Sequence, residues 1–496
     1  MRCVLNPSSI EDYQRFLKIK NLPQYRFAGR TAIFPDEYMR EVLGHKKPQE
    51  IVKDYSPSDF LFDYQRDIAR MAIRKRKFAV FADCGLGKTL IYAEWIRYLD
   101  SMLPADKAIL WVSPLMVMSQ SQEELRRWYG TQLEFEMVSA SGLREWLRTG
   151  GRFGMTNFEA LRDDVEPGRI GALIVDESSM LKSHYGKWGR TILRLGRGLE
   201  WKLTGTGTPA PNDRIEYANH AVLMDAFPNI NSFLARYFVN RGQTSERWAL
   251  KPHAIGPFYR ALSHWSIFLT NPATYGWRDH AEDIPPIHIH IHRIPLTNEQ
   301  WNAAHDLTGS LLPGTCAGGI GQRSKLGQIA KGSVNGRELP TNKPKFIREL
   351  VDSWPNESTI IWCIYNREQE QMERTFPGAA SITGATPYSD RHRLVTDFKE
   401  GRRRVLITKP KILGFGLNLQ IATRQVFSGL QDSYEQYYQA VKRSNRVGST
   451  RPLNVHIPIT EIERPMVQNV LNKAERIQAD TEEQERIFKD HAAIQG

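Results

Sequence analysis

The chain has 496 residues, 41% of them hydrophobic, and its formal net charge is +12 at pH 7. This length and composition are enough for two or more hydrophobic cores, and they exclude a disordered protein and a small disulfide-stabilised one. No apolar run is long enough to span a membrane and the N-terminus lacks the apolar core of a signal peptide, so we expect a cytoplasmic protein with reduced cysteines. The basic surplus favours a polyanionic partner, first of all nucleic acid, although a basic protein without such a partner would have the same composition.

Residues 1–57 combine basic and aromatic side chains, as in the sequence YQRFLKIK, and are predicted to form a small accessory region. Such a mixture suits contacts with a nucleic-acid backbone and its bases. An ordinary amphipathic surface has the same pattern and is the simpler interpretation.

The sequence KFAVFADCGLGKT predicts a buried strand, a glycine-bearing turn and the start of a helix in direct succession. Gly85 and Gly87 allow backbone N–H groups to approach an anion, and the start of the helix adds the positive end of its dipole. Lys88 is expected to reach the β- and γ-phosphates of a nucleotide, and the Thr89 hydroxyl to hold Mg²⁺. Ala82 stands where the general phosphate-loop pattern has a glycine, so a glycine-rich turn with a solvated lysine is the alternative.

Further apolar strands end at hydroxyl, amide or carboxylate side chains and alternate with helical segments. They lie within residues 108–114, 155–159, 172–179 and 201–212. The pattern predicts a parallel sheet covered on both faces, with ligands at the carboxyl ends of the strands. Asp176 and Glu177 lie at such an end, where Asp176 would hold the metal and Glu177 would orient or deprotonate the attacking water. Two solvated acids at the end of a strand are the alternative.

The sequence pattern changes in the middle of the chain. Residues 213 to about 283 are predicted as a helical elaboration of the first sheet region, and the prolines at 285 and 286 mark a linker. The following sequence IHIHIHR places three histidines on one face of a strand; such a face could bind a metal, but a half-exposed strand with its polar side chains outward fits better. Residues 313–341, rich in glycine and serine, are predicted as a mobile loop.

A second series of strands and helices starts near residue 343. On the helix predicted from Tyr434 to about Val447, the side chains of Gln439, Arg443 and Arg446 would share one face. Two arginines that project together suit a triphosphate whose other side is held by Lys88 and Mg²⁺. Pairing with surface acids is the alternative, but residues 442–446 include no carboxylate.

The order of these motifs resembles the Swi/Snf-like branch of the superfamily-two helicases, over roughly residues 60–480. In that family a glutamine motif, a phosphate loop, an Asp-Glu pair, a Thr-Gly-Thr-Pro-x-x-Asn segment and two arginines recur in this order. The corresponding residues here are Tyr64-Gln65, Asp83 to Thr89, Asp176-Glu177, Thr206 to Asn212, and Arg443 with Arg446. A glycine at the position of Ala82 is not required in this branch.

The resemblance implies an α/β fold with two RecA-like parallel-sheet lobes and helical elaboration, ATP and Mg²⁺ as cofactors, and DNA as the track. The first lobe would cover residues 58–285 with a helical insertion from about 213, the linker and second lobe 286–460, and a helical tail 461–496 would brace the lobes. The catalytic candidates are Glu177, Arg443 and Arg446. The nucleotide-binding candidates are Gln65, Asp83, Gly85, Gly87, Lys88 and Thr89, and the metal ligands are Thr89 and Asp176. The candidates for coupling or DNA contact are Ser113, Pro114, Asn157, Thr206, Thr208, Gly384, Thr408, Gly416 and Asn418.

Three departures from the family pattern stand out. Ser178-Ser179 follow the acid pair, an extra Thr204-Gly205 precedes the Thr-Gly-Thr-Pro segment and leaves its register open, and Ser449 replaces a glutamine. None removes a group needed for hydrolysis.

The resemblance favours a compact motor of bacterial or phage type, in the host cytosol, that translocates on duplex or branched DNA in replication, recombination or repair. Replication or recombination proteins are candidate partners. A strand-separating DNA or RNA helicase and a non-catalytic DNA-binding scaffold are the rival functions. We find no convincing hairpin signal for a strand-separating wedge among the second-lobe motifs, although residues 318–336 could contain one.

Overall fold

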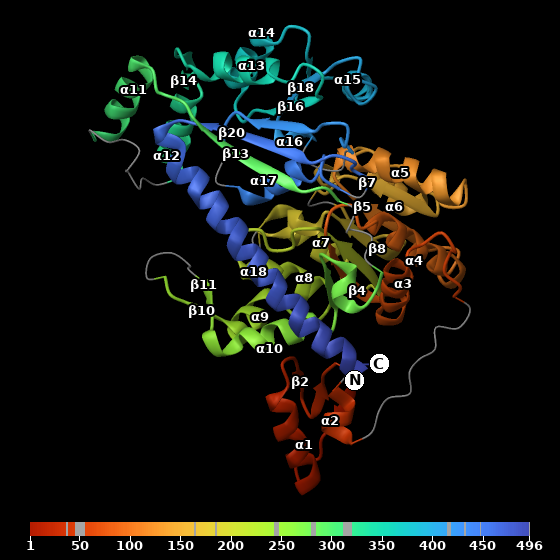
Figure 1. Ribbon diagram of the computed structural model, residues 1–496. Helices are drawn as coiled ribbons and strands as arrows, with labels where there is room; N and C mark the ends of the chain where they lie inside the picture. The colour runs from red at the N-terminus through yellow and green to blue at the C-terminus, as the bar shows by residue number, and fades with distance from the viewer. Residues whose placement is uncertain are drawn as a thin grey trace. The chain divides into compact units, whose positions relative to one another are not determined.

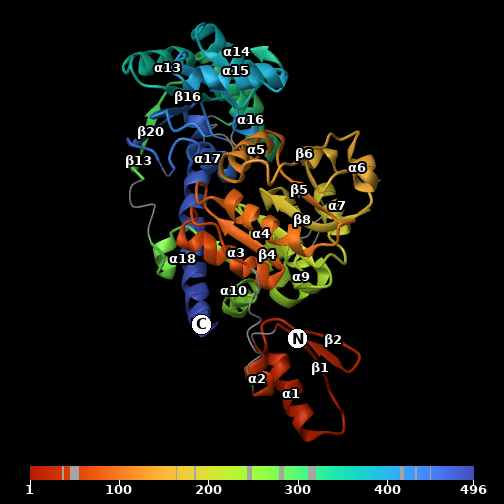
Figure 2. The same ribbon diagram turned by 90° about the vertical axis from the view of Figure 1, so that its right-hand side faces the viewer.

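The computed structural model describes residues 1–35, 38–44, 55–162, 165–183, 186–242, 248–278, 284–310, 320–413, 418–430, 433–446 and 448–495. The chain forms two compact units, Met1–Asp279 together with Ala479–Gly496, and His280–Gln478. We call them the first and the second unit, and their helices and strands are labelled in Figures 1 and 2. None of the helices that can be described is long and apolar enough to cross a membrane.

The first unit is built on a seven-stranded sheet of order β12-β4-β9-β8-β5-β7-β6, in which every pairing is parallel. Its strands are β4 (Lys77–Ala82), β5 (Ala108–Val112), β6 (Glu136–Met137), β7 (Phe153–Thr156), β8 (Ile170–Asp176), β9 (Trp201–Gly205) and β12 (Ser266–Leu269). Its helices are α3 (Asp63–Lys75), α4 (Lys88–Met102), α5 (Leu115–Tyr129), α6 (Leu143–Thr149), α7 (Lys187–Leu195), α8 (Tyr217–Leu223), α9 (Ile230–Tyr237) and α10 (Ile255–Leu262).

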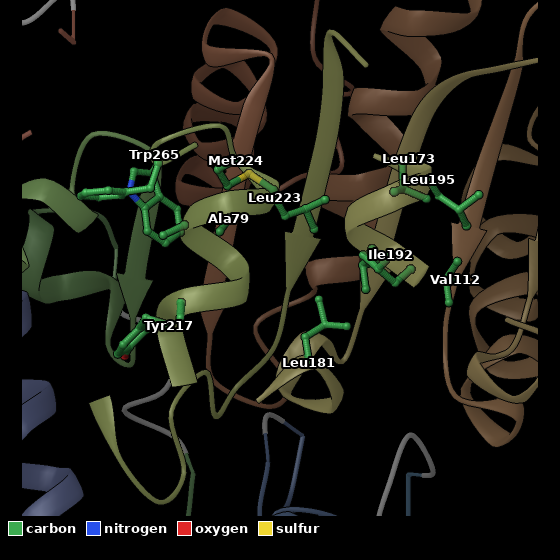
Figure 3. Packing of buried hydrophobic residues seen from close by; sticks show 14 of the residues in the cluster. Ala79, Val112, Leu173, Leu181, Ile192, Leu195, Tyr217, Leu223, Met224 and Trp265 are labelled. Atoms are coloured by element: carbon green, nitrogen blue, oxygen red, sulfur yellow. The ribbon is translucent and has the colours of Figure 1, made fainter. Parts of the chain in front are cut away.

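Neighbouring residues of the central strands point into two different hydrophobic cores, which explains why these strands are apolar throughout. Phe78 and Val80 of β4 pack in one core with residues of α3 and α4. Ala79 and Phe81 pack in the other core with residues of α7 to α10, part of which is shown in Figure 3. The predicted parallel sheet covered on both faces is therefore confirmed.

The segment predicted as purely helical contains more than α8, α9 and α10. It also forms a small hairpin, β10 (Phe238–Asn240) with β11 (Trp248–Leu250), and it supplies β12, which pairs in parallel with β4 at the edge of the first sheet. The sequence prediction missed these strands because an apolar run of four residues does not distinguish a strand from a turn of buried helix.

The N-terminal residues form a small module of their own. Three antiparallel strands in the order β1-β3-β2, β1 (Arg2–Val4), β2 (Arg26–Ala28) and β3 (Thr31–Ile33), lie with α1 (Ile10–Asn21) and α2 (Met39–Leu43), as Figure 2 shows. Ile19, Ala32 and Phe34 belong to a hydrophobic core confined to this module.

The second unit has a six-stranded sheet of order β13-β20-β19-β16-β18-β17, again with parallel pairings. Its strands are β13 (Ile287–Arg293), β16 (Thr359–Trp362), β17 (Ala380–Ser381), β18 (Val405–Thr408), β19 (Arg424–Phe427) and β20 (Leu453–Ile459). Its helices are α11 (Asn298–Thr308), α12 (Ile320–Ala330), α13 (Lys343–Asp352), α14 (Asn366–Thr375), α15 (Tyr388–Lys399), α16 (Pro410–Leu413), α17 (Tyr434–Val441) and the start of α18 (Arg464–Gln495). The last turns of α18 belong to the first unit, where Phe488 joins the core.

The histidine-rich strand β13 is an edge strand whose side chains are mostly exposed. His290 Nε2 lies 3.0 Å from Asn454 Oδ1, and His292 Nε2 lies 3.0 Å from His456 Nδ1 on the neighbouring strand β20. Over the described part of the chain, no group of three or more His, Cys, Asp and Glu side chains could hold a metal ion. These contacts favour the interpretation as a half-exposed strand.

The prediction of a mobile loop for residues 313–341 is wrong from residue 320 onward. Helix α12 is followed by a hairpin of β14 (Ser333–Val334) and β15 (Arg337–Glu338). Asn335 and Gly336 at its tip have positive φ angles of 44° and 81°, as a two-residue hairpin turn requires. A hairpin with an Asn-Gly turn is therefore present at the end of residues 318–336, where the sequence left one open, although its two strands have only two residues each.

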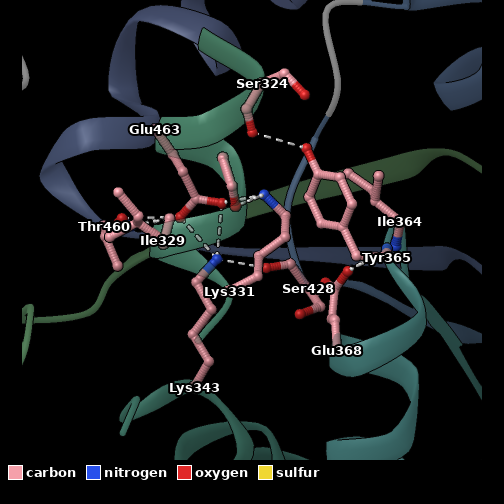
Figure 4. Close-up of polar contacts among 12 residues, drawn as sticks. Ser324, Ile329, Lys331, Lys343, Ile364, Tyr365, Glu368, Ser428, Thr460 and Glu463 are labelled. Atoms are coloured by element: carbon pink, nitrogen blue, oxygen red, sulfur yellow. Dashed lines mark hydrogen bonds and ion pairs between the residues drawn. The ribbon is translucent and has the colours of Figure 1, made fainter. Parts of the chain in front are cut away.

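A buried ionic cluster lies where α12, α13 and the end of β20 meet (Figure 4). Glu463 binds Lys331 and Lys343, each with an N–O distance of 2.7 Å, and all three side chains are at most 2% exposed. Burial favours the neutral acid, but the two lysines lower the pKa of Glu463 to about 2. Gly429 leaves the necessary space, since a Cβ there would lie 2.2 Å from Cε of Lys331.

Candidate nucleotide site

The phosphate loop connects β4 to α4 at the carboxyl edge of the first sheet. Gly85 and Gly87 have φ angles of 90° and 68°, a region that strongly favours glycine. The Lys88 ammonium donates to the carbonyl oxygen of Ala82 at 2.8 Å, and Thr89 follows in the first turn of α4. Asp83 accepts a hydrogen bond from the N–H of Cys84 at 2.6 Å. The loop therefore has the backbone shape expected for a phosphate cradle.

Gln65 is buried against this loop. Its amide oxygen accepts from the N–H of Phe62 at 3.0 Å, and its amide nitrogen donates to the carbonyl of Leu86 at 3.4 Å. A Cβ on Gly87 would lie 2.2 Å from that nitrogen. Gln65 thus supports the shape of the loop, and its contact with adenine stays a prediction.

Asp176 is held at the end of β8 by three hydrogen bonds. Its carboxylate accepts from the Tyr92 hydroxyl at 3.2 Å, from the Ser113 hydroxyl at 3.2 Å and from the N–H of Glu177 at 2.9 Å. Burial, and then the charge of Glu177, raise the pKa of Asp176 to about 7, against the opposing effects of Lys88 and the hydrogen bonds. Ser113 was predicted as a candidate for coupling or DNA contact, and in the structure its hydroxyl is hydrogen-bonded to Asp176, the candidate metal ligand.

Glu177 has a left-handed backbone with a φ of 46°, which is uncommon for a residue with a side chain and occurs in turns and at functional sites. Its carboxylate accepts from the Thr206 hydroxyl at 3.2 Å, and that hydroxyl oxygen in turn accepts from the N–H of Thr208 at 3.2 Å. This contact settles the register of the Thr-Gly repeat: Thr206, not Thr204, meets the acid pair.

Two residues near the acids were missed by the sequence analysis. Tyr92 is fully buried on α4, one turn beyond Lys88, so its helical spacing could have placed it on the side of the helix that faces the site. His220 of α8 lies 2.9 Å from the hydroxyl of Ser178, which follows Glu177, and burial lowers the pKa of His220 to about 4. No local sequence signal connects α8 with the acids.

Gly205 faces Tyr92 across the sheet end. A Cβ at this glycine would lie 1.8 Å from the Tyr92 hydroxyl and 3.1 Å from the carbonyl oxygen of Val80. Only glycine leaves the tyrosine in place beside Asp176.

The other candidates in the first unit have structural contacts. Pro114 is the N-cap residue immediately before α5, and Asn157 caps the short helical turn after β7 by accepting from the N–H of Ala160 at 2.9 Å. Thr208 is buried beside Thr206. Their roles in coupling or DNA contact stay predictions.

The predicted arrangement of the two arginines on one helical face is wrong. Helix α17 ends at Val441, so Arg443 and Arg446 lie beyond it. Two side chains beyond the helix bind residues far away in the chain instead of continuing it. Asn445 donates to the carbonyl of Pro285 at 2.7 Å, and Ser444 accepts from the side chain of Gln425 at 2.8 Å.

The two arginines also differ in their surroundings. Arg443 is 3% exposed and donates to the side chain of Gln439 at 2.6 Å, whereas Arg446 is partly exposed. Within the second unit, Arg443 is buried against Gln439, and its catalytic role stays a prediction. The nucleotide contact of Arg446 stays a prediction.

Of the remaining second-unit candidates, Thr408 ends β18 and Gly384 follows β17 by three residues. Arg391 donates to the carbonyl of Gly384 at 2.6 Å, and the Thr408 hydroxyl at the end of β18 donates to the carbonyl of Ile382 at 3.1 Å. Asn418 accepts from the N–H of Gln420 at 3.3 Å. Gly416 lies outside the described residues.

The side chains at the phosphate loop and the acid pair suit the binding of Mg²⁺ together with a nucleotide. The Thr89 hydroxyl and the Asp176 carboxylate are hard oxygen ligands of the kind Mg²⁺ prefers. Asp176 is buried beside a second carboxylate, an arrangement that a divalent cation would stabilise. Lys88 and the backbone of Gly85 and Gly87 supply the groups for the phosphates.

Comparison with known proteins shows what the chain is similar to. Residues 342–448 match the model of the helicase conserved C-terminal domain. Protein p41 of Acyrthosiphon pisum secondary endosymbiont phage 1 is 23% identical over 433 residues, which cover 79% of this chain and 91% of p41. The DNA annealing helicase and endonuclease ZRANB3 of Mus musculus is 23% identical over 445 residues, 82% of this chain but 40% of ZRANB3. A solved structure, the SWI2/SNF2 ATPase core of Sulfolobus solfataricus in complex with dsDNA, is 18% identical, covers 83% of this chain and 90% of that chain, and has a TM-score of 0.39.

The two parallel-sheet units, the ordered motifs and the matched C-terminal domain resemble those of helicase-like proteins with two RecA-like lobes. The order of the motifs is similar to that of the Swi/Snf-like branch of helicase superfamily two, and the alignment with the phage relative covers most of both chains.

Proposed function

We propose that this chain is an ATP-dependent motor on duplex DNA, a DNA-stimulated ATPase that remodels or branch-migrates DNA in replication, recombination or repair. The observation that carries the proposal is the meeting, at one edge of a parallel sheet, of the phosphate loop with its Lys88 and the buried pair Asp176 and Glu177. In parallel α/β sheets this edge is where ligands bind.

In this proposal the loop holds the phosphates of ATP and Glu177 acts on the attacking water. Water attacks the γ-phosphorus, the bond to the ADP oxygen breaks, and Glu177 orients the water or takes its proton. Mg²⁺ held by Thr89 and Asp176 would neutralise charge on the β- and γ-phosphates. Thr206 donates a hydrogen bond to Glu177, so a change around Glu177 when the γ-phosphate is lost would be transmitted to the segment that begins at Thr206. Arg446 would add positive charge in the transition state.

Duplex DNA as the track is supported by the net charge of +12 and by a relative named as a DNA annealing helicase. A motor that moves on DNA without reading its sequence should bind mainly the phosphates. We therefore expect affinity that falls steeply with salt and hardly varies with base sequence.

The test is ATPase activity of the full chain with no nucleic acid, single-stranded DNA, duplex DNA, forked DNA and RNA, with Lys88→Ala as the inactive control. Strongest stimulation by duplex or branched DNA supports the proposal. Strongest stimulation by RNA would favour an RNA helicase instead. No hydrolysis with any of them, from a chain that binds DNA, would favour a scaffold with an inactive ATPase core.

A further inference from the structure

The N-terminal module presents one face of its sheet to solvent. The pairing register places Arg2, Ile33 and Arg26 in one row across the three strands, and Val4, Thr31 and Ala28 in the next row. The alternate residues Cys3, Ala32 and Phe27 belong to the module core. Because side chains alternate between the faces of a strand, the two rows form the opposite, outward face.

This outward face is basic. Arg2 and Arg26 are exposed, and so is Arg30 in the turn between β2 and β3. The three strands and their connecting turn include no Asp or Glu, and none of these arginines has an ion pair among the described residues. By contrast, Arg15 on α1 is paired with Asp12 at 2.6 Å. Ile33 of β3 lies between Arg2 and Arg26, and Val4, which is 71% exposed, and Ala28 lie on either side of Thr31 in the next row.

The module is attached to the rest of the first unit by other residues. The carbonyl oxygens of Leu22 and Pro23 accept from Arg236 at 2.6 Å and from the Tyr237 hydroxyl at 2.7 Å, and Gln24 donates to the carbonyl of Ala226 at 2.8 Å. These contacts come from the segment before β2, so they fix the module while leaving the outward face open.

We propose that this outward sheet face binds the phosphate backbone of duplex DNA and gives the motor a grip in addition to its lobes, an inference that rests on the proposed function. Arginine suits phosphate because its planar guanidinium can donate two parallel hydrogen bonds. Arg2 and Arg26 stand two strand spacings apart, roughly 10 Å, so they would contact different phosphates. An acidic protein surface is the competing occupant.

The test compares duplex DNA binding by the full chain, the double variant Arg2→Ala with Arg26→Ala, and a control double variant Arg70→Ala with Arg126→Ala. The control arginines are also exposed and belong to the first unit, but each is paired with an acid, Asp67 or Glu134. Both variants lose two positive charges. Affinity is measured by fluorescence anisotropy at several salt concentrations without nucleotide.

We expect the slope of log affinity against log salt to become shallower by about 2 in the Arg2 and Arg26 variant, since each phosphate contact contributes about 0.9. The control should keep the slope of the unchanged chain, and all three chains should have the same ATPase activity without DNA.

An unchanged slope in the Arg2 and Arg26 variant would overturn the inference and leave the face to an acidic protein. An equal change in both variants would also overturn it, because the effect would then come from net charge alone. If the unchanged chain does not bind duplex DNA at all, the proposed function fails instead.

Discussion

Glu177 is the residue on which the proposed hydrolysis depends most directly. Glu177→Gln keeps the contact with Thr206 possible but removes the base, so we expect ATP to bind while turnover falls about 10²- to 10⁴-fold. Lys88→Ala should instead weaken ATP binding itself. Nucleotide binding by fluorescence and turnover by phosphate release separate the two effects, and normal turnover by Glu177→Gln would show that another group activates the water.

The two arginines of the second unit should respond differently to the same substitution. Arg443→Ala removes a buried charged hydrogen bond to Gln439 and should lower stability by about 2 kcal/mol. Arg446→Ala should leave the melting temperature unchanged and reduce turnover by about 10³-fold, the usual contribution of a transition-state arginine. A loss of only twofold would return Arg446 to the surface ion-pair interpretation.

Tyr92 should influence how tightly the site holds Mg²⁺. Tyr92→Phe keeps the ring in place but removes the hydrogen bond to Asp176, so the Mg²⁺ concentration for half-maximal ATPase activity should rise about tenfold. Tyr237→Phe is the matched control, since that buried hydroxyl donates to the carbonyl of Pro23 away from the site. An identical Mg²⁺ requirement in both variants would show that Tyr92 only fills space.

At the scale of elements, the ionic cluster around Glu463 joins helices and strands of the second unit. Glu463→Gln would leave Lys331 and Lys343 buried without their counter-charge and should cost about 3–5 kcal/mol of stability. The pKa of Glu463 is lowered from 4.5 to about 2, so the unfolded chain binds more protons between these values. Stability from this group is therefore present above pH 4.5 and is lost as the pH falls toward 2.

Denaturant unfolding at several pH values, monitored in the second unit, checks this prediction. Glu349→Gln is the control because Glu349 is an exposed partner of Lys345 on α13. If both variants unfolded at the same denaturant concentration, the cluster would not contribute to stability.

The elements that the sequence predicted well are those whose signal is local. The phosphate loop, the Asp-Glu pair and the apolar strands of both sheets are each encoded by contiguous residues. In the structure the loop and the acid pair lie at the carboxyl ends of the parallel strands β4 and β8. The end of α17 was misplaced because it depends on hydrogen bonds of Ser444 and Asn445 with residues far away in the chain. The contact of His220 with Ser178 depends on tertiary packing in the same way. The hairpin at Asn335 and Gly336 is different, since its turn signal is local and lies in the stretch where a hairpin was left open, but its two-residue strands give no strand signal.

At the scale of the whole molecule, the proposed motor could either separate strands or move along an intact duplex. A wedge would need a protruding hairpin with aromatic tip residues, whereas the hairpin β14–β15 is short and has Asn335 and Gly336 at its tip. We therefore expect the chain with ATP to displace a third strand from a triplex, or a bound protein from duplex DNA, and to unwind a simple fork poorly.

Parallel gel assays on a triplex and on a forked duplex measure both activities, with Lys88→Ala as the control. Efficient unwinding of the fork without displacement of the triplex strand would replace the translocase by a conventional helicase.

The close approach of Gly205 to Tyr92 also restricts the order in which these two positions can be substituted. A methyl group at position 205 would lie 1.8 Å from the tyrosine hydroxyl and 2.9 Å from the ring carbon that bears it. Tyr92→Phe would remove the hydroxyl but leave this ring carbon, so Gly205→Ala stays too close with either aromatic residue at position 92. Position 205 can therefore accept a methyl group only after position 92 has changed to a smaller residue. The order of the two substitutions decides which sequences single changes can reach.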